Sequence, residues 1–309
     1  MEGGVIQVND LTKIYDDLVA VDHVSFDVHR GEIFSLVGPN GAGKTTTVEI
    51  LECLRNPTEG QAEIFGYDVV GESEEVKERI GVMPQEFNTF DRLTVRENVE
   101  LVGGIYGRSE NLDEVYEDLG LSEESDKNFE ELSGGMKRRV GIAMALAGNP
   151  DVLFLDEPTT GLDPRARREL WDTIKGLKDL GVTIVLTTHY MEEVEELSDR
   201  AGIILDGNLL SVDSVEDLIS EYGEDVKIVV RDSGEARNIL ERYTKDVFSE
   251  ETGEFVGRFE SMRHAAEAHF QLYKELSGQL DVELVGPSME DVFLNVAGGR
   301  IDESGKLIE

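Results

Sequence analysis

The chain has 309 residues, 39% of them hydrophobic, and its 66 acidic residues outnumber 29 basic ones to give a net charge of −37. This length and apolar content allow one large domain or two modest ones with a buried core, and argue against disorder. The acidic balance excludes the basic surface that nucleic-acid phosphates require, so we expect no nucleic-acid partner. We attribute the charge to a folded protein that works in concentrated salt, where self-repulsion is screened, and we expect a halophilic source.

The sequence contains no targeting or membrane-spanning signal. No run approaches the roughly 18 apolar residues of a membrane span. The first ten residues, MEGGVIQVND, lack the basic start and apolar run of a signal peptide. The single cysteine, Cys53, cannot form an internal disulfide. We therefore expect a cytosolic chain.

Two strand patterns open the chain. Val5–Thr12 and Val19–Val28 alternate apolar with polar residues and predict two antiparallel strands. Tyr15 lies in their connection, where its ring is either an ordinary loop tyrosine or a platform for a nucleotide base. Ile33–Val37 is a short apolar run and predicts a buried parallel strand.

A phosphate-binding pattern follows that strand. Residues Gly38–Thr45 fit G-x-x-x-x-G-K-[ST], and the chain after them has no helix breaker as far as Cys53. Glycines let the backbone approach a ligand closely, and the helix N-terminus adds partial positive charge. Lys44 can reach the outer phosphates, and the Thr45 hydroxyl can bind Mg²⁺. The predicted nucleotide-binding residues are Gly38, Pro39, Asn40, Gly41, Ala42, Gly43, Lys44, Thr45 and Thr46.

The next segment predicts a strand, a short helix and a second buried strand that ends at Gln85. The character changes between about Phe87 and Gly148, where helical spacing carries acidic residues on its outer side. The predicted elements are strand Gln61–Phe65, helix Ser73–Arg79, strand Ile80–Pro84, helices Thr94–Tyr106 and Leu112–Leu119, and a loop at Leu121–Glu131.

Leu132–Met136 begins a helix that we expect to be packed on one side. Ser133 is a suitable N-cap, and Ser133-Gly134-Gly135 at a helix start is a second place suited to an anion. The basic run Lys137–Arg139 predicts a solvated helix face, or else charges that offset nearby phosphate.

Carboxylates follow the next buried strand. Val152–Leu155 is wholly apolar and ends in Asp156 and Glu157. An aspartate there can hold Mg²⁺ through its water shell, and the glutamate can orient or deprotonate a water. The strand Val182–Thr187 leads to His189, which is either structural or, because ligands bind at the carboxyl ends of parallel strands, functional.

The rest of the chain, after Glu157, predicts several helices, a hairpin and a separate small domain. After residue 215 the order β-α-β-β-α-β suggests an α+β sandwich of ferredoxin-like type. Residues after about Gly298 read as a loose tail. The predicted elements are helix Gly161–Leu180, helix Tyr190–Asp199, hairpin Ala201–Val212, strand Val226–Val230, helix Gly234–Arg242, hairpin Val247–Phe259 turning at Thr252-Gly253, helix Ser261–Leu276, strand Leu280–Val285 and helix Ser288–Ala297.

From Val5 to about Val212 the chain resembles the ATP-binding subunit of an ABC transporter. The resemblance lies in the order and spacing of motifs, and Tyr15 matches the family's adenine-stacking aromatic. It implies an α/β P-loop NTPase domain of ABC type, with a mixed sheet, an antiparallel β subdomain and a helical subdomain inserted at about 87–148. The matching segments are Gly38–Thr46 (Walker A), Gln85 (Q-loop), Leu132–Met136 (the LSGGQ signature), Val152–Glu157 (Walker B with its catalytic glutamate), Gly161–Asp163 (D-loop) and His189 (H-loop).

Some marks resemble one subfamily, the ABC-2 type exporters of the daunorubicin-resistance sort. These marks are SGGM followed by Lys-Arg-Arg, the stretch Thr188–Glu193 and the C-terminal Pro287–Phe293. Met136 departs from the signature's final glutamine, but the serine and glycines that bind phosphate in this family are intact. We therefore expect activity to be retained.

The resemblance implies domains at 1–215 and 216–298, with a tail at 299–309. It also implies a head-to-tail dimer, of two copies or with a related ATPase, that holds two ATP molecules with Mg²⁺ and works beneath a separate membrane permease on the inner face of the cell membrane. The resemblance also implies a role for each site residue. Catalysis is implied for Glu157, His189 and Gln85, and Mg²⁺ binding for Thr45, Gln85 and Asp156. Nucleotide binding is implied for the Walker A residues, Tyr15, Ser133, Gly134, Gly135 and Asp163.

Other classes fit less well. An import ATPase is the closest alternative. A soluble ABC ATPase acting on DNA or ribosomes predicts a long coiled-coil insertion or two cassettes, with basic patches. A P-loop kinase or GTPase is opposed by the signature and by His189. A regulatory cassette without hydrolysis would usually have lost Glu157, His189 or Lys44, and all three are present. The cargo stays open among drugs, lipids, polysaccharides and ions.

Overall fold

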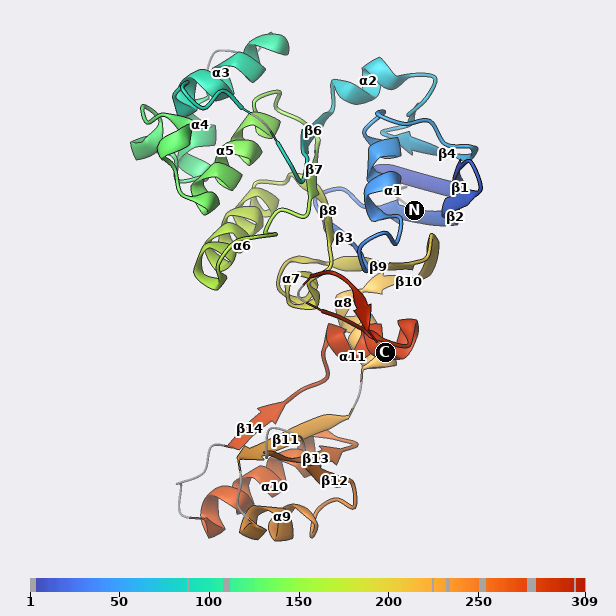
Figure 1. Ribbon diagram of the computed structural model, residues 1–309, viewed down its shortest axis with the longest axis vertical. Coiled ribbons are helices and arrows are strands. Elements are labelled where there is room, and N and C mark those ends of the chain that lie inside the picture. The colour runs from blue at the N-terminus through green and yellow to red at the C-terminus, as the bar shows by residue number, and fades with distance from the viewer. Residues whose placement is uncertain are drawn as a thin grey trace. The chain divides into compact units, whose positions relative to one another are not determined.

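The computed structural model describes residues 4–87, 89–107, 112–223, 225–231, 234–249, 254–276, 282–302 and 304–308. The chain divides into two compact units, one of residues 1–215 with 296–309 and the other of residues 216–295. Figure 1 labels the elements of both. In the described part of the chain, no helix combines the length and the apolar character needed to cross a membrane.

A six-stranded sheet forms the centre of the first unit, in the order β10-β9-β3-β8-β7-β6. Its strands are parallel except β10, which pairs antiparallel with β9, so the predicted mixed sheet is confirmed. All residues of β3, β7 and β8 are buried, which explains why they read as apolar runs. The strands are β3 (Ile33–Val37), β6 (Ile80–Met83), β7 (Val152–Asp156), β8 (Thr183–Thr188), β9 (Arg200–Leu205) and β10 (Asn208–Ser214).

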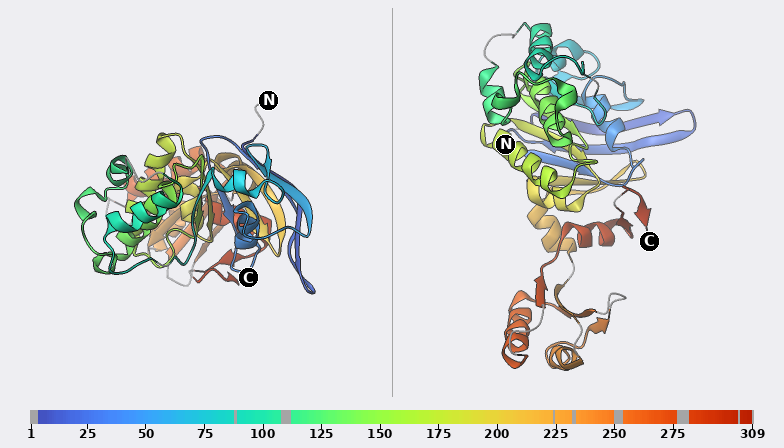
Figure 2. Two further views of the ribbon diagram at one scale, coloured as in Figure 1. Left: turned by 90° about the horizontal axis from the view of Figure 1, so that it is seen from above. Right: turned by 60° about the vertical axis from the view of Figure 1, so that its left-hand side comes forward.

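A second, antiparallel sheet has the order β2-β1-β4-β5 and confirms the predicted hairpin at the start of the chain. Figure 2 shows the long β1–β2 hairpin extending past the six-stranded sheet. The ring of Phe26 stacks on Phe34 of β3 with centroids 5.1 Å apart, which joins the two sheets in one apolar core. The elements are β1 (Ile6–Tyr15), β2 (Leu18–Val28), α1 (Lys44–Leu51), β4 (Glu59–Ile64), β5 (Tyr67–Asp68) and α2 (Ser73–Lys77).

The apolar cluster of the inserted helical region includes the buried Tyr116 and is continuous with side chains of α6 and of the central sheet. A capping box between Thr94 and Glu97 starts its first helix. The predicted loop at 121–131 is partly wrong, because two short 3₁₀ turns, Ser122–Glu124 and Phe129–Glu131, form there. Short polar stretches of this kind lack the periodicity that reveals a helix. The helices are α3 (Val95–Ile105), α4 (Asp113–Asp118) and α5 (Gly134–Leu146).

Two helices flank the carboxyl edge of the central sheet. Helix α6 (Pro164–Asp179) begins at Asp163, which accepts from the backbone of Arg165 and Ala166, and Pro164 holds its first position. Helix α7 (Met191–Leu197) is shorter than predicted.

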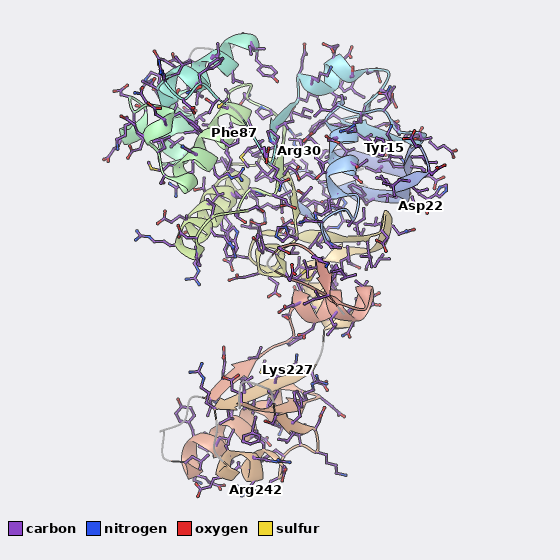
Figure 3. All side chains as sticks on the ribbon, viewed as in Figure 1. Tyr15, Asp22, Arg30, Phe87, Lys227 and Arg242 are labelled. Atoms are coloured by element: carbon purple, nitrogen blue, oxygen red, sulfur yellow. The ribbon has the colours of Figure 1, made fainter. Side chains whose placement is uncertain are left out.

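The second unit contains the predicted β-α-β-β-α-β order, with a sheet ordered β12-β13-β11-β14. Lys227, which is labelled in Figure 3, pairs with Asp291 at 2.9 Å. The predicted turn at Thr252-Gly253 and the strand start at Leu280 lie outside the described residues. Helix α8 (Val215–Tyr222) was not predicted from the sequence, because its acidic first turn resembles a linker. The other elements are β11 (Val226–Arg231), α9 (Gly234–Leu240), β12 (Val247–Ser249), β13 (Glu254–Phe259), α10 (Met262–Glu275), β14 (Val282–Val285) and α11 (Met289–Ala297).

The stretch after Gly298, expected as a loose tail, contains a small hairpin of β15 (Arg300–Ile301) and β16 (Leu307–Ile308). Asp302 Oδ1 accepts hydrogen bonds from the backbone of Ser304 and Lys306, which closes the turn. A side chain that satisfies its own turn gives structure to a segment with few apolar residues.

Candidate functional site

The phosphate-binding loop joins β3 to α1 in a conformation that demands glycine. Gly43 has a φ of 106° and lies directly before the helix. A Cβ on Gly43 would come 2.5 Å from the Ala20 carbonyl oxygen, and one on Gly38 would come 2.1 Å from that of Ile204. The loop backbone is thus held tightly against its surroundings. The first backbone N–H groups of α1 have no partner within the helix and are available to donate to an anion in the loop.

Lys44 is a buried cation at the start of α1. Its Nζ donates to the carbonyl oxygens of Gly38 at 2.6 Å and Pro39 at 3.0 Å, and lies 3.7 Å from Glu157 Oε1. Burial lowers the pKa of Lys44, although the carboxylates of Glu157 and Asp156 act in the opposite direction. This arrangement places a positive charge between the loop and the acidic residues at the end of β7.

Thr45 and Asp156 form a pair of oxygen donors from two elements. The Thr45 hydroxyl lies 3.4 Å and 3.5 Å from the two Asp156 carboxylate oxygens, and the Thr187 hydroxyl donates to Oδ1. Burial raises the pKa of Asp156. A hydroxyl and a carboxylate are hard oxygen ligands, and they leave room for the waters that Mg²⁺ retains. These residues therefore fit a magnesium ion.

Glu157 is the most highly connected acid of the site. Its Oε2 accepts from Gln85 Nε2 and from the Thr160 hydroxyl, each at 3.0 Å, and its Oε1 lies 3.3 Å from His189 Nδ1. Burial alone would raise the pKa of Glu157, but contacts with His189, Lys44 and Thr160 outweigh it, so the pKa is lowered. Glu157 is thus held ionised. Gln85, predicted as a metal ligand, contacts this carboxylate in the structure.

His189 follows β8 and is buried beside Glu157. It is 5% exposed, its Nδ1 lies 3.3 Å from Glu157 Oε1, and its Nε2 has no hydrogen-bond partner among the described residues. A buried imidazole nitrogen without a partner is unusual for a structural histidine and indicates a missing polar ligand. His189, Asp156 and Glu157 come together because β7 and β8 are neighbouring parallel strands whose carboxyl ends share one edge.

Other predicted residues lie apart from this cluster. Ser133 caps α5 by accepting from Met136 N at 3.4 Å, and it is exposed. Within the described residues, no hydrogen bond joins Ser133–Gly135 to the Gly38–Thr46 loop. Asp163 is exposed at the start of α6.

Tyr15 ends β1 on the antiparallel sheet, as Figure 3 shows. Its half-buried ring lies beneath Lys13 Nζ, 5.0 Å from the centroid, and the Arg55 guanidinium, 5.7 Å away. Both are cation–π contacts, so one side of the ring already has partners.

Asn40 forms hydrogen bonds with the C-terminal hairpin that were not predicted from the sequence. Its backbone N–H donates to the Gly305 carbonyl at 2.6 Å, and its side-chain amide donates to the Ser304 carbonyl at 2.8 Å. One N–H group of the phosphate-binding loop is therefore occupied by the chain's own C-terminal hairpin.

Arg138 supports the site and was also missed. It donates to the Gln85 carbonyl at 2.7 Å and to the Thr160 carbonyl at 3.2 Å. Burial lowers the pKa of Arg138. The prediction of a solvated basic face is wrong for this residue, because its guanidinium binds the two segments whose side chains hold Glu157. The only sequence signal was an isolated basic run in an acidic chain.

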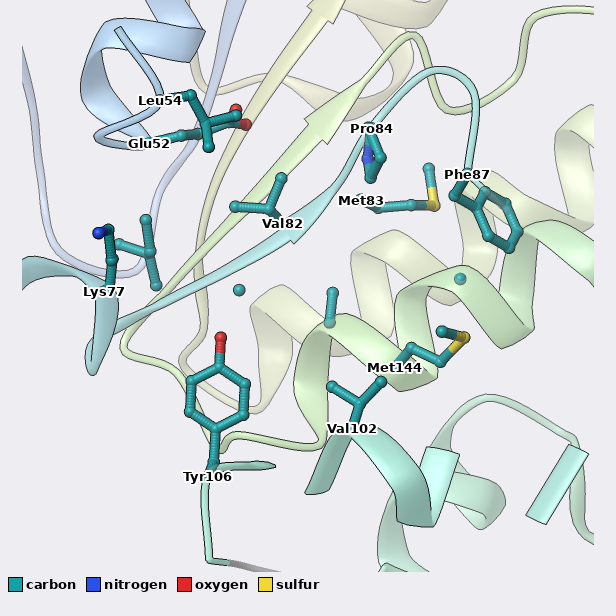
Figure 4. A pocket seen from close by; sticks show the side chains of 14 residues that line it. Glu52, Leu54, Lys77, Val82, Met83, Pro84, Phe87, Val102, Tyr106 and Met144 are labelled. Atoms are coloured by element: carbon teal, nitrogen blue, oxygen red, sulfur yellow. The ribbon is translucent and has the colours of Figure 1, made fainter. Parts of the chain in front are cut away.

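A pocket of about 340 Å³ opens beside the Gln85 segment, between β6 and helices α3 and α5 (Figure 4). Its wall is mostly apolar, but it includes Glu52, which is 6% exposed. Burial and the nearby charge of Asp156 raise the pKa of Glu52 to about 8. Side chains around the pocket include Leu54, Val82, Met83, Pro84, Phe87, Val102, Tyr106 and Met144.

The mixed sheet and the convergence of a phosphate-binding loop, an oxygen-donor pair and an ionised glutamate define an ATP-hydrolysing protein of the P-loop class. Residues 21–160 match the family model described as "ABC transporter". The linearmycin resistance ATP-binding protein LnrL of Bacillus subtilis is 35% identical over 95% of this chain and 98% of its own length. The chain therefore belongs to the ABC transporter family, as an ATP-binding and ATP-hydrolysing subunit.

Further relatives match along most of the chain. The daunorubicin/doxorubicin resistance ATP-binding protein DrrA of Streptomyces peucetius is 34% identical over 96% of this chain and 94% of its own. The Nod factor export ATP-binding protein I of Burkholderia lata is 37% identical over 96% of this chain and 98% of its own length. The predicted resemblance to exporters of the daunorubicin-resistance sort is confirmed.

Solved structures agree with the fold. The cbiO1 protein of Clostridium perfringens, part of the ABC transporter complex cbiONQ, has a TM-score of 0.66 at 26% identity, covering 71% of this chain and 92% of its own. The ATP-binding cassette MJ0796, in a dimer bound to ADP and phosphate, has a TM-score of 0.60 at 29% identity. The match covers 68% of this chain and 98% of MJ0796.

Proposed function

We propose that this chain powers export through a separate membrane permease, by closing with a second ATPase copy around ATP and reopening after hydrolysis. The observation that carries the proposal is Glu157, an ionised carboxylate in contact with Lys44, Gln85 and His189. Relatives matched along most of the chain are named for drug resistance and Nod factor export, which supports export over import. The chain would then lie on the inner face of the membrane, beneath its permease.

The geometry supports the following proposed roles. Gly41, Gly43 and Lys44 cradle the β- and γ-phosphates, and Thr46 reaches the α-phosphate. Thr45 and Asp156 would hold Mg²⁺, with Gln85 completing its surroundings. When bound, the ion neutralises charge on the phosphate oxygens. Gly38, Pro39, Asn40 and Ala42 line the rest of the triphosphate site, and Asn40 donates to a phosphate only once its bonds to Ser304 and Gly305 are released.

Glu157 orients the attacking water and accepts its proton, because it is the ionised carboxylate closest to the Lys44 charge. His189 contacts the γ-phosphate, which would give its unpartnered Nε2 an acceptor. This is catalysis by positioning and charge stabilisation, as phosphoryl transfer requires.

A second copy completes the site. Ser133 and Gly134 are exposed at the N-terminus of α5. A helix N-terminus can bind an anion, and this one is separate from the phosphate-binding loop of the same chain. We propose that Ser133, Gly134 and Gly135 close over the γ-phosphate held by the opposite copy, with Asp163 at the same interface. Tyr15 stacks on adenine. The second copy is this chain again or a related ATPase.

Replacing Glu157 with glutamine tests the proposed chemistry. The amide keeps the shape of the side chain but cannot take a proton, so we expect ATP turnover to fall by about 100-fold or more while ATP binding is retained. Turnover and nucleotide binding are measured on the purified chain in high salt. Wild-type turnover by the variant would show that Glu157 is not the base.

A further inference from the structure

Glu193 is a fully buried acid that the proposed mechanism leaves unused. Helix α7 carries four glutamates, and three of them, at 192, 195 and 196, are exposed. Glu193 instead has no exposed surface. A buried carboxyl costs free energy unless hydrogen bonds compensate, so its surroundings need a physical reason.

One carboxyl oxygen of Glu193 joins two separate segments. Oε1 accepts from the Thr159 hydroxyl at 2.7 Å and from Trp171 Nε1 at 3.0 Å. Thr159 stands two residues after Glu157. Trp171 belongs to α6, the helix that Asp163 begins. The same carboxyl therefore fixes the loop behind the attacking-water residue and the helix behind the D-loop.

The neighbours of His189 in the chain, Thr188 and Tyr190, lie close to Glu193 and α6. The Thr188 hydroxyl lowers the pKa of Glu193 against the larger effect of burial, and it accepts a hydrogen bond from Tyr190 N at 3.0 Å. The Tyr190 ring lies 4.1 Å from the His189 ring, and the guanidinium of Arg167 lies over it at 4.3 Å. Arg167 is one helical turn before Trp171, so α6 holds this segment at two points on one face.

We propose that Glu193 is a positioning residue for ATP hydrolysis, which holds Glu157 and His189 at their working separation through Thr159, Trp171 and Thr188. Strands β7 and β8 end one residue before Glu157 and His189, so the sheet positions these two residues less firmly than the strands themselves, although Glu157 N still donates to Thr187. The inference rests on the proposed function of Glu157 and His189.

The charge on Glu193 is not needed for this role. Burial raises its pKa, which favours the neutral carboxyl, and the two hydrogen bonds to Oε1 can be accepted by a neutral oxygen. Glutamine presents the same acceptor oxygen to Thr159 and Trp171. A positioning role through hydrogen bonds therefore predicts that glutamine substitutes for glutamate and alanine does not.

The experiment compares Glu193→Ala, Glu193→Gln and Thr159→Val, with Glu192→Ala as the control on the exposed face of the same helix. We expect Glu193→Ala to lower kcat about tenfold with ATP affinity unchanged, because misplacement acts on the reaction step and not on binding. Glu193→Gln and Glu192→Ala should stay within about twofold of the wild-type kcat. A purely structural role would change the amount of folded protein and not the kcat of the folded fraction.

Thr159→Val keeps the inference falsifiable if Glu193→Ala does not fold, because it removes one hydroxyl and preserves volume. It should lower kcat about threefold, and combining it with Glu193→Ala should add nothing further. Wild-type kcat in Thr159→Val, or equal damage from Glu193→Gln and Glu193→Ala, would overturn the inference. If Glu157→Gln abolishes turnover while these variants behave as wild type, only the role of Glu193 fails and the proposed function stands.

Discussion

At the scale of single residues, environment assigns different tasks to carboxylates of the same type. Glu157 has its pKa lowered because His189 and Lys44 outweigh the effect of burial. Glu52 and Glu193 have theirs raised because burial dominates. The first is therefore held ionised, whereas burial favours the neutral form of the other two.

Glu52 predicts a pH dependence of stability. Its pKa in the folded chain is raised from 4.5 to about 8, so between these values the folded state binds a proton that the unfolded state has released. Stability must therefore fall as pH rises through this window. We expect Glu52→Gln to match the wild type near pH 5 and to exceed it near pH 8 by on the order of 3 kcal/mol in unfolding free energy.

Denaturant unfolding at several pH values measures this difference. Glu75→Gln, on the exposed surface of α2, serves as the control and should show no such widening. A gap between wild type and Glu52→Gln that is constant with pH would contradict the raised pKa of Glu52.

How much of the site was predictable depends on where each contact lies in the chain. The phosphate-binding loop and the acids after β7 follow from short local patterns, because strand, loop and helix are contiguous there. Glu193, Arg138 and the contact of Asn40 with Ser304 were missed, because each depends on packing between distant segments. An acidic helix and a basic run both read as solvated surface until tertiary structure buries one of their members.

At the scale of elements, helix α5 serves two surfaces. Its N-terminus carries the exposed Ser133 and Gly134, while its middle and end line the pocket beside Gln85 through Gly141, Met144 and Ala145. Arg138 connects the helix to the Gln85 segment. A partner seated in the pocket would thus contact the same helix whose start we propose to close over ATP.

We propose that this pocket and the exposed end of α3 receive the permease. Ile105 is 77% exposed and precedes Tyr106, which lines the pocket together with Val102. A charge at Ile105 should not affect the distant phosphate-binding loop, so we expect Ile105→Glu to keep the ATPase rate of the isolated chain. It should reduce recovery of the permease about tenfold or more, since desolvating an unpaired charge opposes docking.

Co-purification of the permease in high salt measures this loss. Leu180→Glu is a matched control, because Leu180 is 62% exposed at the end of α6 and outside the pocket. Equal permease recovery with Ile105→Glu and with the wild type would exclude this docking surface.

At the scale of the whole molecule, the net charge of −37 determines the conditions for folding. Ion pairs such as Arg200 with Glu32 and Lys178 with Asp199 neutralise part of the acidic surface. The acids that remain repel one another within the folded chain. Salt screens this repulsion over a Debye length that falls from about 10 Å at 0.1 M to about 3 Å at 1 M. The same ions weaken exposed ion pairs, which contribute little individually.

We propose that the protein is adapted to concentrated salt and expect its Tm to rise by about 10 °C between 0.1 M and 2 M KCl. Thermal unfolding measures this, with sucrose at matched osmolality as a control that does not screen charge. A Tm that is flat or falls with KCl would refute the adaptation.

The central claim is that ATP is hydrolysed between two copies, one giving the Gly38–Thr46 loop and the other Ser133–Gly135. Two variants test it: Lys44→Ala, which disables the loop, and Gly134→Asp, which places a negative charge against the γ-phosphate. Aspartate in the first turn of α5 also favours the helix, so Gly134→Asp should fold. Each variant alone should be inactive. Mixed dimers retain one intact site, and half of all dimers are mixed.

The decisive measurement is the ATPase rate of an equal mixture of Lys44→Ala and Gly134→Asp chains. We predict recovery of about a quarter of the wild-type rate, because one of two sites is intact in half of the dimers. No recovery on mixing, or undiminished hydrolysis by Gly134→Asp alone, would contradict a site shared between two copies of this chain.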